Sequence, residues 1–287
     1  MSYSSIPKQT NDLINGGFYH SAPVALSVKS KVPNGVVLSA NGKSSPSGAI
    51  SGGFEASFPD KVSGVTLTQG WTADNKLTTK FALPSFAPGL KTELATTFVP
   101  SAGSRGANVT FNYSHGPFTS KIFADLLKGP TFKSDFAFAK SGATIGGEVE
   151  YDIPAGAVKG YAAAVGYAGP GYSVFASATS KLSVFSAGYY TKASDDVQVA
   201  TKATWNSKEP AQAVDFEIAS QYKIGPTSFS KAKISNKGIL TLAYTNTLQD
   251  GVKLGFGVSV DTQKLNNPVH KAGLSFSFES AAPVAKF

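Results

Sequence analysis

The sequence predicts an all-β fold, a transmembrane β-barrel of about 19 strands in an antiparallel meander, preceded by a short helix. Three observations predict it. Segments of alternating polar and apolar residues, separated by short turns, follow one another from about residue 22 to residue 279. Charged residues make up only 15% of the chain, against about 25% in soluble domains. No apolar run approaches the roughly 20 residues of a membrane-spanning helix.

The alternation is clearest near the C-terminus. In residues 252–260, valine, leucine or phenylalanine occupies every second position, and Lys253, glycine and serine lie between them. Residues 270–278 repeat this pattern, and residues 24–31 show it near the start. A period of two with one apolar face is typical of a strand whose two faces meet different surroundings.

One closed barrel explains these segments better than a soluble sandwich. Turn-forming residues, for example at 33–35, 236–238 and 249–251, divide the chain into more strands than one sandwich holds. Closure also pairs the backbone groups that a sheet edge would leave exposed to lipid. If the count is odd, the first strand (24–31) and the last (270–278) run in the same direction, so the closing pair must be parallel.

The first twenty residues do not alternate, and we expect a helix over residues 8–15. Ser5 is the candidate cap, Pro7 suits the first turn, and Gly16-Gly17 would end the helix. A helix this short is marginal alone, so we expect it to lie against the barrel; a frayed terminus is the alternative. The chain therefore divides into a helical segment at 1–20, a barrel at 21–279 and a tail at 280–287.

The residue inventory argues against catalysis. The chain has no cysteine and three widely spaced histidines, which predicts neither a disulfide nor a metal site. No serine elbow with a matching histidine and acid, and no phosphate-binding loop, occurs. Arg105 is the single arginine, and no basic cluster is present, which disfavours nucleic-acid binding. We expect no enzyme activity and no cofactor.

Short motifs in order along the chain point to a family: Asn11-Asp12-Leu13-Ile14 with Phe18-Tyr19-His20, Leu67-Thr68-Gln69-Gly70-Trp71, Gly89-Leu90-Lys91, Asp250-Gly251-Val252-Lys253-Leu254-Gly255, and, after Asp261, Lys264 and Leu265, Val269-His270-Lys271-Ala272-Gly273-Leu274. With these motifs the chain resembles the mitochondrial voltage-dependent anion channels (eukaryotic mitochondrial porins), most of all their fungal members. The resemblance covers nearly the whole chain.

The resemblance implies a nineteen-stranded barrel in the mitochondrial outer membrane with its N-terminal helix in the lumen. It implies a voltage-gated, weakly anion-selective channel for nucleotides and other small metabolites. The lipid bilayer and the barrel-assembly machinery would be its partners, and assembly into a homo-oligomer is a further possibility. The implied gating segment comprises Ile6, Lys8, Asp12, Leu13, Ile14, Gly16 and Gly17.

Two departures from the family pattern are expected. Some relatives carry a lipid-facing glutamate on the fourth strand, where we place Val62. Relatives also carry a lysine just after the helix, where this chain has Gly16, so that phosphate contact does not transfer.

Alternation also predicts which charges face the lumen. The expected lumen lysines are Lys29, Lys80, Lys91, Lys133, Lys231, Lys233, Lys253 and Lys271, and the expected lumen acids are Glu55, Glu93, Glu148, Glu150, Asp215 and Glu217. The chain carries a net charge of +8, so we expect a modest preference for anions.

The last strand carries a pattern formed by Lys271, Gly273, Phe276 and Phe278 that resembles the insertion signal of mitochondrial barrel proteins. Any good lipid-facing strand can produce such a pattern by chance. Two other functions stay open: the related protein-import pore of the same membrane, and a soluble all-β binding module.

Overall fold

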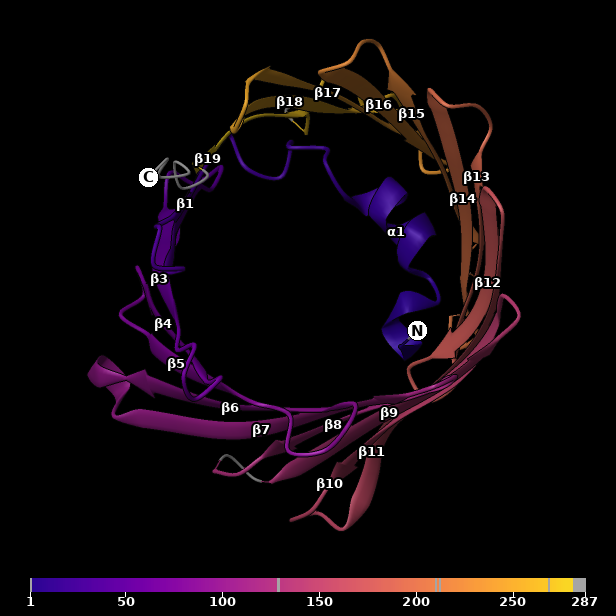
Figure 1. Cartoon of the computed structure of the whole chain (residues 1–287). Helices are drawn as coiled ribbons and strands as arrows, with labels where there is room; N and C mark the ends of the chain where they lie inside the picture. Colours follow the sequence, from indigo (N-terminus) through magenta and orange to yellow (C-terminus); the bar gives the residue numbers. More distant parts are fainter. Residues whose placement is uncertain (1, 128–129, 210, 212, 268, 281–287) are drawn as a thin grey trace.

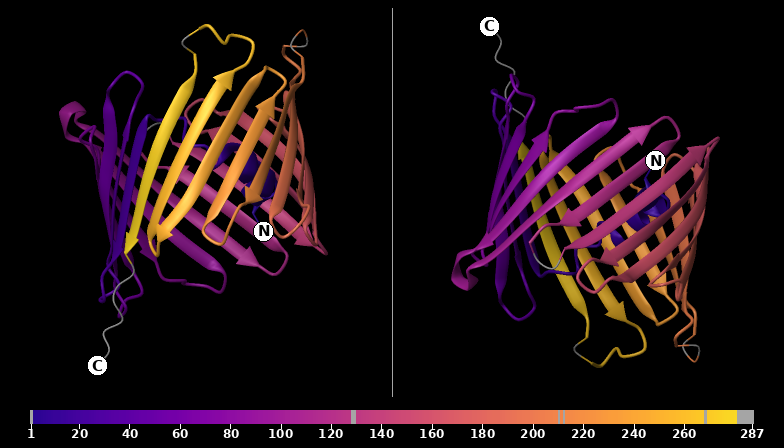
Figure 2. Two further views of the ribbon diagram at one scale, coloured as in Figure 1. Left: turned by 90° about the horizontal axis from the view of Figure 1, so that it is seen from above. Right: turned by 90° about the horizontal axis from the view of Figure 1, so that it is seen from below.

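The computed structural model describes residues 2–127, 130–209, 211, 213–267 and 269–280. It forms one closed sheet of 19 strands around a lumen, with the N-terminal segment inside the ring (Figure 1). The strands are tilted against the barrel axis, as Figure 2 shows from two sides. Barrels of 16–18 strands already leave an aqueous channel, so this ring is too wide for its inward side chains to fill.

The strands follow one another in chain order: β1 (Val24–Lys31), β2 (Val37–Ser44), β3 (Ile50–Pro59), β4 (Thr66–Thr72), β5 (Leu77–Leu83), β6 (Leu90–Val99), β7 (Ser104–His115), β8 (Phe118–Asp125), β9 (Thr131–Lys140), β10 (Ala143–Asp152), β11 (Ala157–Gly169), β12 (Tyr172–Thr179), β13 (Val184–Lys192), β14 (Val197–Asn206), β15 (Asp215–Lys223), β16 (Ser228–Ser235), β17 (Ile239–Gln249), β18 (Val252–Asp261) and β19 (Lys271–Ser280).

The parallel closure is confirmed. Each strand pairs antiparallel with the next, and β1 pairs parallel with β19, with Ser27 opposite Ser277. The start of β1 and the β18–β19 loop lie at one end of the barrel, called rim A below. The end of β19 lies at the other, rim B. Among the described residues, no helix is long and apolar enough to cross a bilayer.

The two faces of the sheet follow the predicted alternation. Ala200, Ala219 and Ala243 pack against the N-terminal segment inside the ring, so they mark the inner face. The strand register carries this assignment around the barrel. Positions of the opposite parity form the outer face and hold large exposed side chains such as Phe54 and Phe256.

The N-terminal segment consists of a 3-10 turn, Tyr3–Ser5, and helix α1, Lys8–Asn15, which lies along β13, β14 and β15 (Figure 1). The expected cap at Ser5 is wrong. Pro7 occupies the N-cap position, and the Ser5 hydroxyl donates to the carbonyl of Ser2, 2.6 Å away. Gly16 follows the helix, and Gly17 adopts a φ of 72°, a conformation that favours glycine.

One expected position needs correction. Val62 does not lie on the fourth strand but in the loop between β3 and β4, where its side chain is 98% exposed. The polar residue that β4 turns outward is Gln69, an uncharged amide. At the C-terminus, Ser280 is the last residue of β19, and residues 281–287 of the expected tail lie outside the described residues. The remaining segment boundaries stay a prediction.

The closing register can be tested by disulfide formation in this cysteine-free chain. Directly opposite residues on neighbouring strands lie about 4.8 Å apart, within the Cα range of disulfides. Ser27→Cys with Ser277→Cys should crosslink under mild oxidation, because these residues face each other across the closing pair. Ser27→Cys with Ser275→Cys, displaced by two residues, is the matched control. A stronger crosslink in the control would contradict the register.

Candidate functional site: the lumen and its docked helix

Helix α1 is held to the inner wall by a small apolar contact. Leu13 and Ile14 are 4% and 0% exposed, and Phe18, just after the helix, is also buried. They pack on Ala200, Ala219 and Ala243, whose short side chains let the helix approach the sheet. Burial of each large side chain contributes about 1.5–3 kcal/mol, which stabilises a helix of eight residues that would be marginal alone.

Glycines extend this docking surface beyond the helix. A Cβ added to Gly257 on β18 would lie 1.8 Å from the carbonyl oxygen of Phe18. A Cβ on Gly273 of β19 would lie 2.1 Å from the carbonyl oxygen of Tyr19. The chain that connects the helix to β1 therefore runs directly over the backbone of the last two strands. Gly273, expected as part of an insertion signal, thus has a packing reason to be glycine.

Three polar contacts anchor the segment. Lys231 on β16 donates from Nζ to the carbonyl of Gly16, 2.7 Å away, at the negative end of the helix. Its side chain is 6% exposed, and Nζ lies 5.0 Å from the centre of the Phe18 ring. The other two contacts are Lys202 Nζ to Asn11 Oδ1, at 3.1 Å, and Tyr19 Oη to Thr245 Oγ1, at 3.0 Å.

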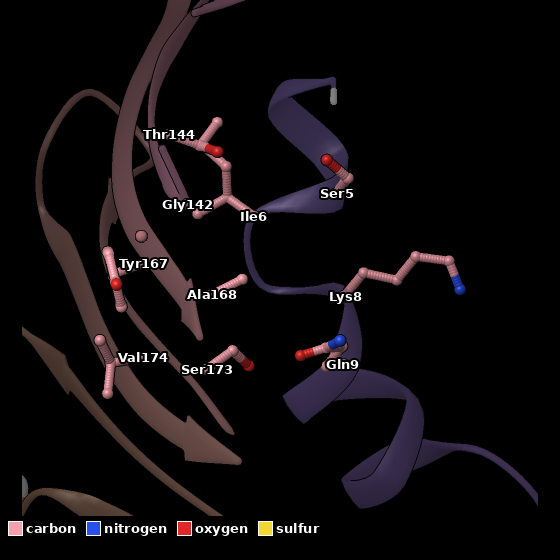
Figure 3. Close-up of a pocket in the computed structure, with 11 residues that line it drawn as sticks. Ser5, Ile6, Lys8, Gln9, Gly142, Thr144, Tyr167, Ala168, Ser173 and Val174 are labelled. Atoms are coloured by element: carbon pink, nitrogen blue, oxygen red, sulfur yellow. The ribbon is translucent and has the colours of Figure 1, made fainter. Parts of the chain in front are cut away.

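The N-terminal half of the segment also lies against wall glycines: Cβ atoms added to Gly146 and Gly166 would lie 3.3 Å and 2.8 Å from side-chain carbons of Tyr3 and Ile6. A cavity of about 220 Å³ lies between residues 5–9 and the wall formed by β10, β11 and β12. Figure 3 shows Ile6 pointing toward this wall and Lys8 pointing away from it. Lys8 instead pairs with Asp12 on the helix surface, and the buried Thr10 hydroxyl has no hydrogen-bond partner. The hydrogen bond from Lys231, which is the charged attachment of the segment, lies at the C-terminal end of the helix.

The register places every expected lumen charge on the inner face, while the transport role of these residues stays a prediction. Most of them are paired with an opposite charge. The ion pairs are Lys29–Glu279 at 3.2 Å, Lys80–Glu55 at 3.7 Å, Lys133–Glu148 at 2.9 Å, Lys233–Glu217 at 3.2 Å, Lys159–Glu150 at 3.4 Å and Lys237–Asp215 at 2.8 Å. Within the described part of the chain, no ion pair involves Lys91, Lys253, Lys271 or Glu93.

The inner face also holds charges that the sequence interpretation missed, although alternation could have found most of them. They are Lys31, Lys43, Lys121, Lys159, Lys192, Lys202, Lys223, Asp125, Asp135, Asp152, Asp261 and Glu279. Lys159 lies beside a bulge in the pairing of β10 and β11, which interrupts the period of two there. The missed lysines and acids nearly balance, so the inner field stays mild.

His20 lies at the end of the docked segment, close to the inner wall. Burial lowers the pKa of the His20 imidazole, and the nearby charges of Lys233 and Lys271 lower it further, against a hydrogen bond to the Phe18 carbonyl that raises it. His20 is therefore neutral near pH 7 and adds no charge to the lumen. The described residues contain no cluster of three or more side chains suited to a metal ion.

This architecture matches known proteins along nearly its whole length. The model of the eukaryotic porin family matches residues 1–273. The chain is 46% identical to the mitochondrial outer membrane protein porin of Candida albicans, over 96% of this chain and 98% of that protein. It is 44% identical to the protein of that name in Neurospora crassa, over 97% of this chain and 99% of that protein.

More distant matches agree with these. The chain is 40% identical to non-selective voltage-gated ion channel 1 of Saccharomyces cerevisiae, over 97% of this chain and 98% of that protein. A mutant of the Rh. blastica porin superposes with a TM-score of 0.54, at 11% identity, over 84% of this chain and 99% of that one. At that identity the last match shows a shared fold alone. On the family match and these relatives, the chain belongs to the eukaryotic porins.

Proposed function

We propose that this chain is a voltage-gated, weakly anion-selective channel that passes nucleotides and other small metabolites across the mitochondrial outer membrane. The observation that carries the proposal is a closed barrel with a charged inner face, an apolar outer face and a helix docked inside. The Candida albicans and Neurospora crassa relatives are named mitochondrial outer membrane porins. The Saccharomyces cerevisiae relative is named a non-selective voltage-gated ion channel.

Weak selectivity follows from the arrangement of the charges. Four of the inner-face lysines, Lys29, Lys80, Lys133 and Lys233, each pair with a carboxylate, so the fields of these four lysines largely cancel beyond a few ångströms. Water in a wide lumen further weakens each remaining charge, and about 0.1 M salt confines its reach to about 10 Å. The excess of lysine therefore biases passage toward anions without forming a tight site. None of the relatives reported above is named a protein-import pore, so the transport of small solutes is the better reading.

The docked helix is the candidate gate. Its charged anchor, Lys231, bonds to the end of the helix at Gly16, and Gly16 and Gly17 give the backbone the freedom to hinge there. A segment attached at one end and looser at the other can leave the wall without unfolding the barrel. The charges that move with it, Lys8 and Asp12, are paired with each other, so the lumen charges on the wall would also contribute to voltage sensing.

The helix anchor gives the first test of gating. Lys231→Met removes the charged donor that bonds to the carbonyl of Gly16 at the end of the helix. Such a bond contributes about 1.5–3 kcal/mol, so without it the helix should leave the wall, and the channel should close, at lower applied voltage. Lys253→Met removes an equal charge from the inner face without touching the helix and is the control. Conductance against voltage in planar bilayers measures the effect. Equal shifts in both variants would attribute gating to lumen charge rather than to the anchor.

Selectivity can be tested by charge reversal. Replacing Lys29, Lys91, Lys253 and Lys271 with Glu changes the lumen by eight charge units, two at each of four positions, which equals the net charge of +8. The reversal potential across a salt gradient should move toward cation preference while the pore stays open. The control reverses four loop lysines, Lys61, Lys76, Lys181 and Lys208, which lie outside the strands. An unchanged reversal potential in the lumen variant would refute the assigned lumen role.

Insertion by the barrel-assembly machinery is part of the proposal and rests on the last strand. Phe276→Asp on β19 should block assembly in isolated mitochondria, measured as loss of resistance to alkaline extraction. Phe256→Asp makes the same outward-facing change on β18, opposite Leu274, and is the matched control. If both variants fail equally, the effect is the general cost of a charge facing lipid, and β19 carries no special signal.

A further inference from the structure

Three rows of outward-facing side chains cross strands β3 to β7, on the side of the barrel away from helix α1 (Figure 1). The row nearest rim A consists of Phe54, Trp71, Leu77, Phe98 and Arg105. The middle row consists of Ala56, Gln69, Thr79, Thr96 and Ala107, and the third of Phe58, Leu67, Phe81, Leu94 and Val109. A row of small or polar residues therefore lies between two rows of bulkier, mostly apolar residues.

At the β5–β7 end these rows border a groove. A surface depression of about 410 Å³ is lined there by Thr79, Thr96, Phe98 and Arg105, and by Leu127 from the β8–β9 loop. This volume is in the range of small-molecule sites. Leu127 is 59% exposed and stands at the edge of the depression. The depression lies on the face that the bilayer covers, so lipid, and not solvent, is what meets it.

Arg105, the single arginine of the chain, stands at the mouth of this depression. It is the second residue of β7, at rim A, and its side chain is exposed. Its guanidinium carbon lies 5.9 Å from the centre of the Phe98 ring. Among the described residues no carboxylate pairs with it. The guanidinium N–H groups are thus available at the level where lipid headgroups begin.

We propose that this groove binds a phospholipid with an anionic headgroup, its phosphate on Arg105 and one acyl chain in the groove. A guanidinium presents parallel N–H donors that match two phosphate oxygens. Leu77, Phe98 and Leu127 supply apolar walls for the chain. The small side chains of Thr96 and Ala107 supply the depth of the groove. A net negative headgroup is favoured because no carboxylate of the described residues pairs with Arg105.

The other outward-facing cation of the described strands provides a matched control. Lys140 is the last residue of β9, at rim B, and is also exposed. It does not line the depression. If a cation at the membrane surface were sufficient, Lys140 would attract anionic lipid equally. The proposal therefore requires a difference between these two positions.

The two tryptophans of the chain make the test local. Trp71 lies in the rim A row, directly opposite Leu77 of the groove wall. Trp205 lies on β14, across the barrel, and also faces outward. In Trp205→Phe protein, refolded as the full chain into phosphatidylcholine vesicles, Trp71 is the sole reporter. The quenching of Trp71 fluorescence by brominated phosphatidylglycerol is compared with its quenching by brominated phosphatidylcholine at the same low mole fraction. Trp71→Phe protein reports from Trp205 in the same way.

Brominated phosphatidylglycerol should associate near Trp71 about fivefold more strongly than brominated phosphatidylcholine at low salt. This excess should disappear in Arg105→Gln, shrink when Ala107→Leu fills the groove, and persist in Lys140→Gln. It should fall as salt rises, and Trp205 should show none. Equal quenching by the two lipids at Trp71, an excess that survives Arg105→Gln, or an undiminished excess in Ala107→Leu would each overturn the proposal. Pore formation by each variant in planar bilayers verifies that its barrel has assembled.

Discussion

The backbone of a protein in lipid must pair its own N–H and C=O groups, because the hydrocarbon offers no partner and each unpaired group costs several kcal/mol. The rest of this structure depends on that constraint. It forces the sheet to close, and with 19 strands closure is possible only through the parallel pair of β1 and β19. The same closure divides every strand into an inner and an outer face, so that one alternating pattern serves both lipid and lumen.

The second consequence concerns small residues. Glycine within a strand usually weakens it, since it adds flexibility and no packing. Here Gly257 and Gly273 allow the chain after the helix to lie directly on the wall, and Ala200, Ala219 and Ala243 do the same for the helix. These positions contribute less to strand stability than larger residues would. The backbone and side chains of the docked segment fill the space that larger side chains would occupy. A short helix that could not persist alone thus becomes part of the inner wall.

The outer face combines two demands. Most of its positions carry large apolar residues, as contact with lipid requires. Across β3 to β7 the middle row is small or polar instead, and its member on β4, Gln69, is an uncharged amide. An amide keeps the hydrogen-bonding capacity of that position without the cost of a charge in lipid. Lipid that meets this row therefore contacts small and polar side chains as well as apolar ones.

Local pattern alone determined the strands, their approximate number and which charges face inward, because side-chain direction in a strand depends only on parity along the chain. Tertiary structure alone decided which distant groups meet. Sequence spacing gives no sign that Lys231 reaches the carbonyl of Gly16 or that Gly273 lies under Tyr19. Nor does it show that Arg105 lines one depression together with Leu127 of the β8–β9 loop. The family resemblance also misplaced Val62, which lies in a loop and not on the fourth strand, since turn boundaries are weakly marked in the sequence. Such contacts depend on the register of many successive pairings, and each pairing adds an offset that no single strand encodes.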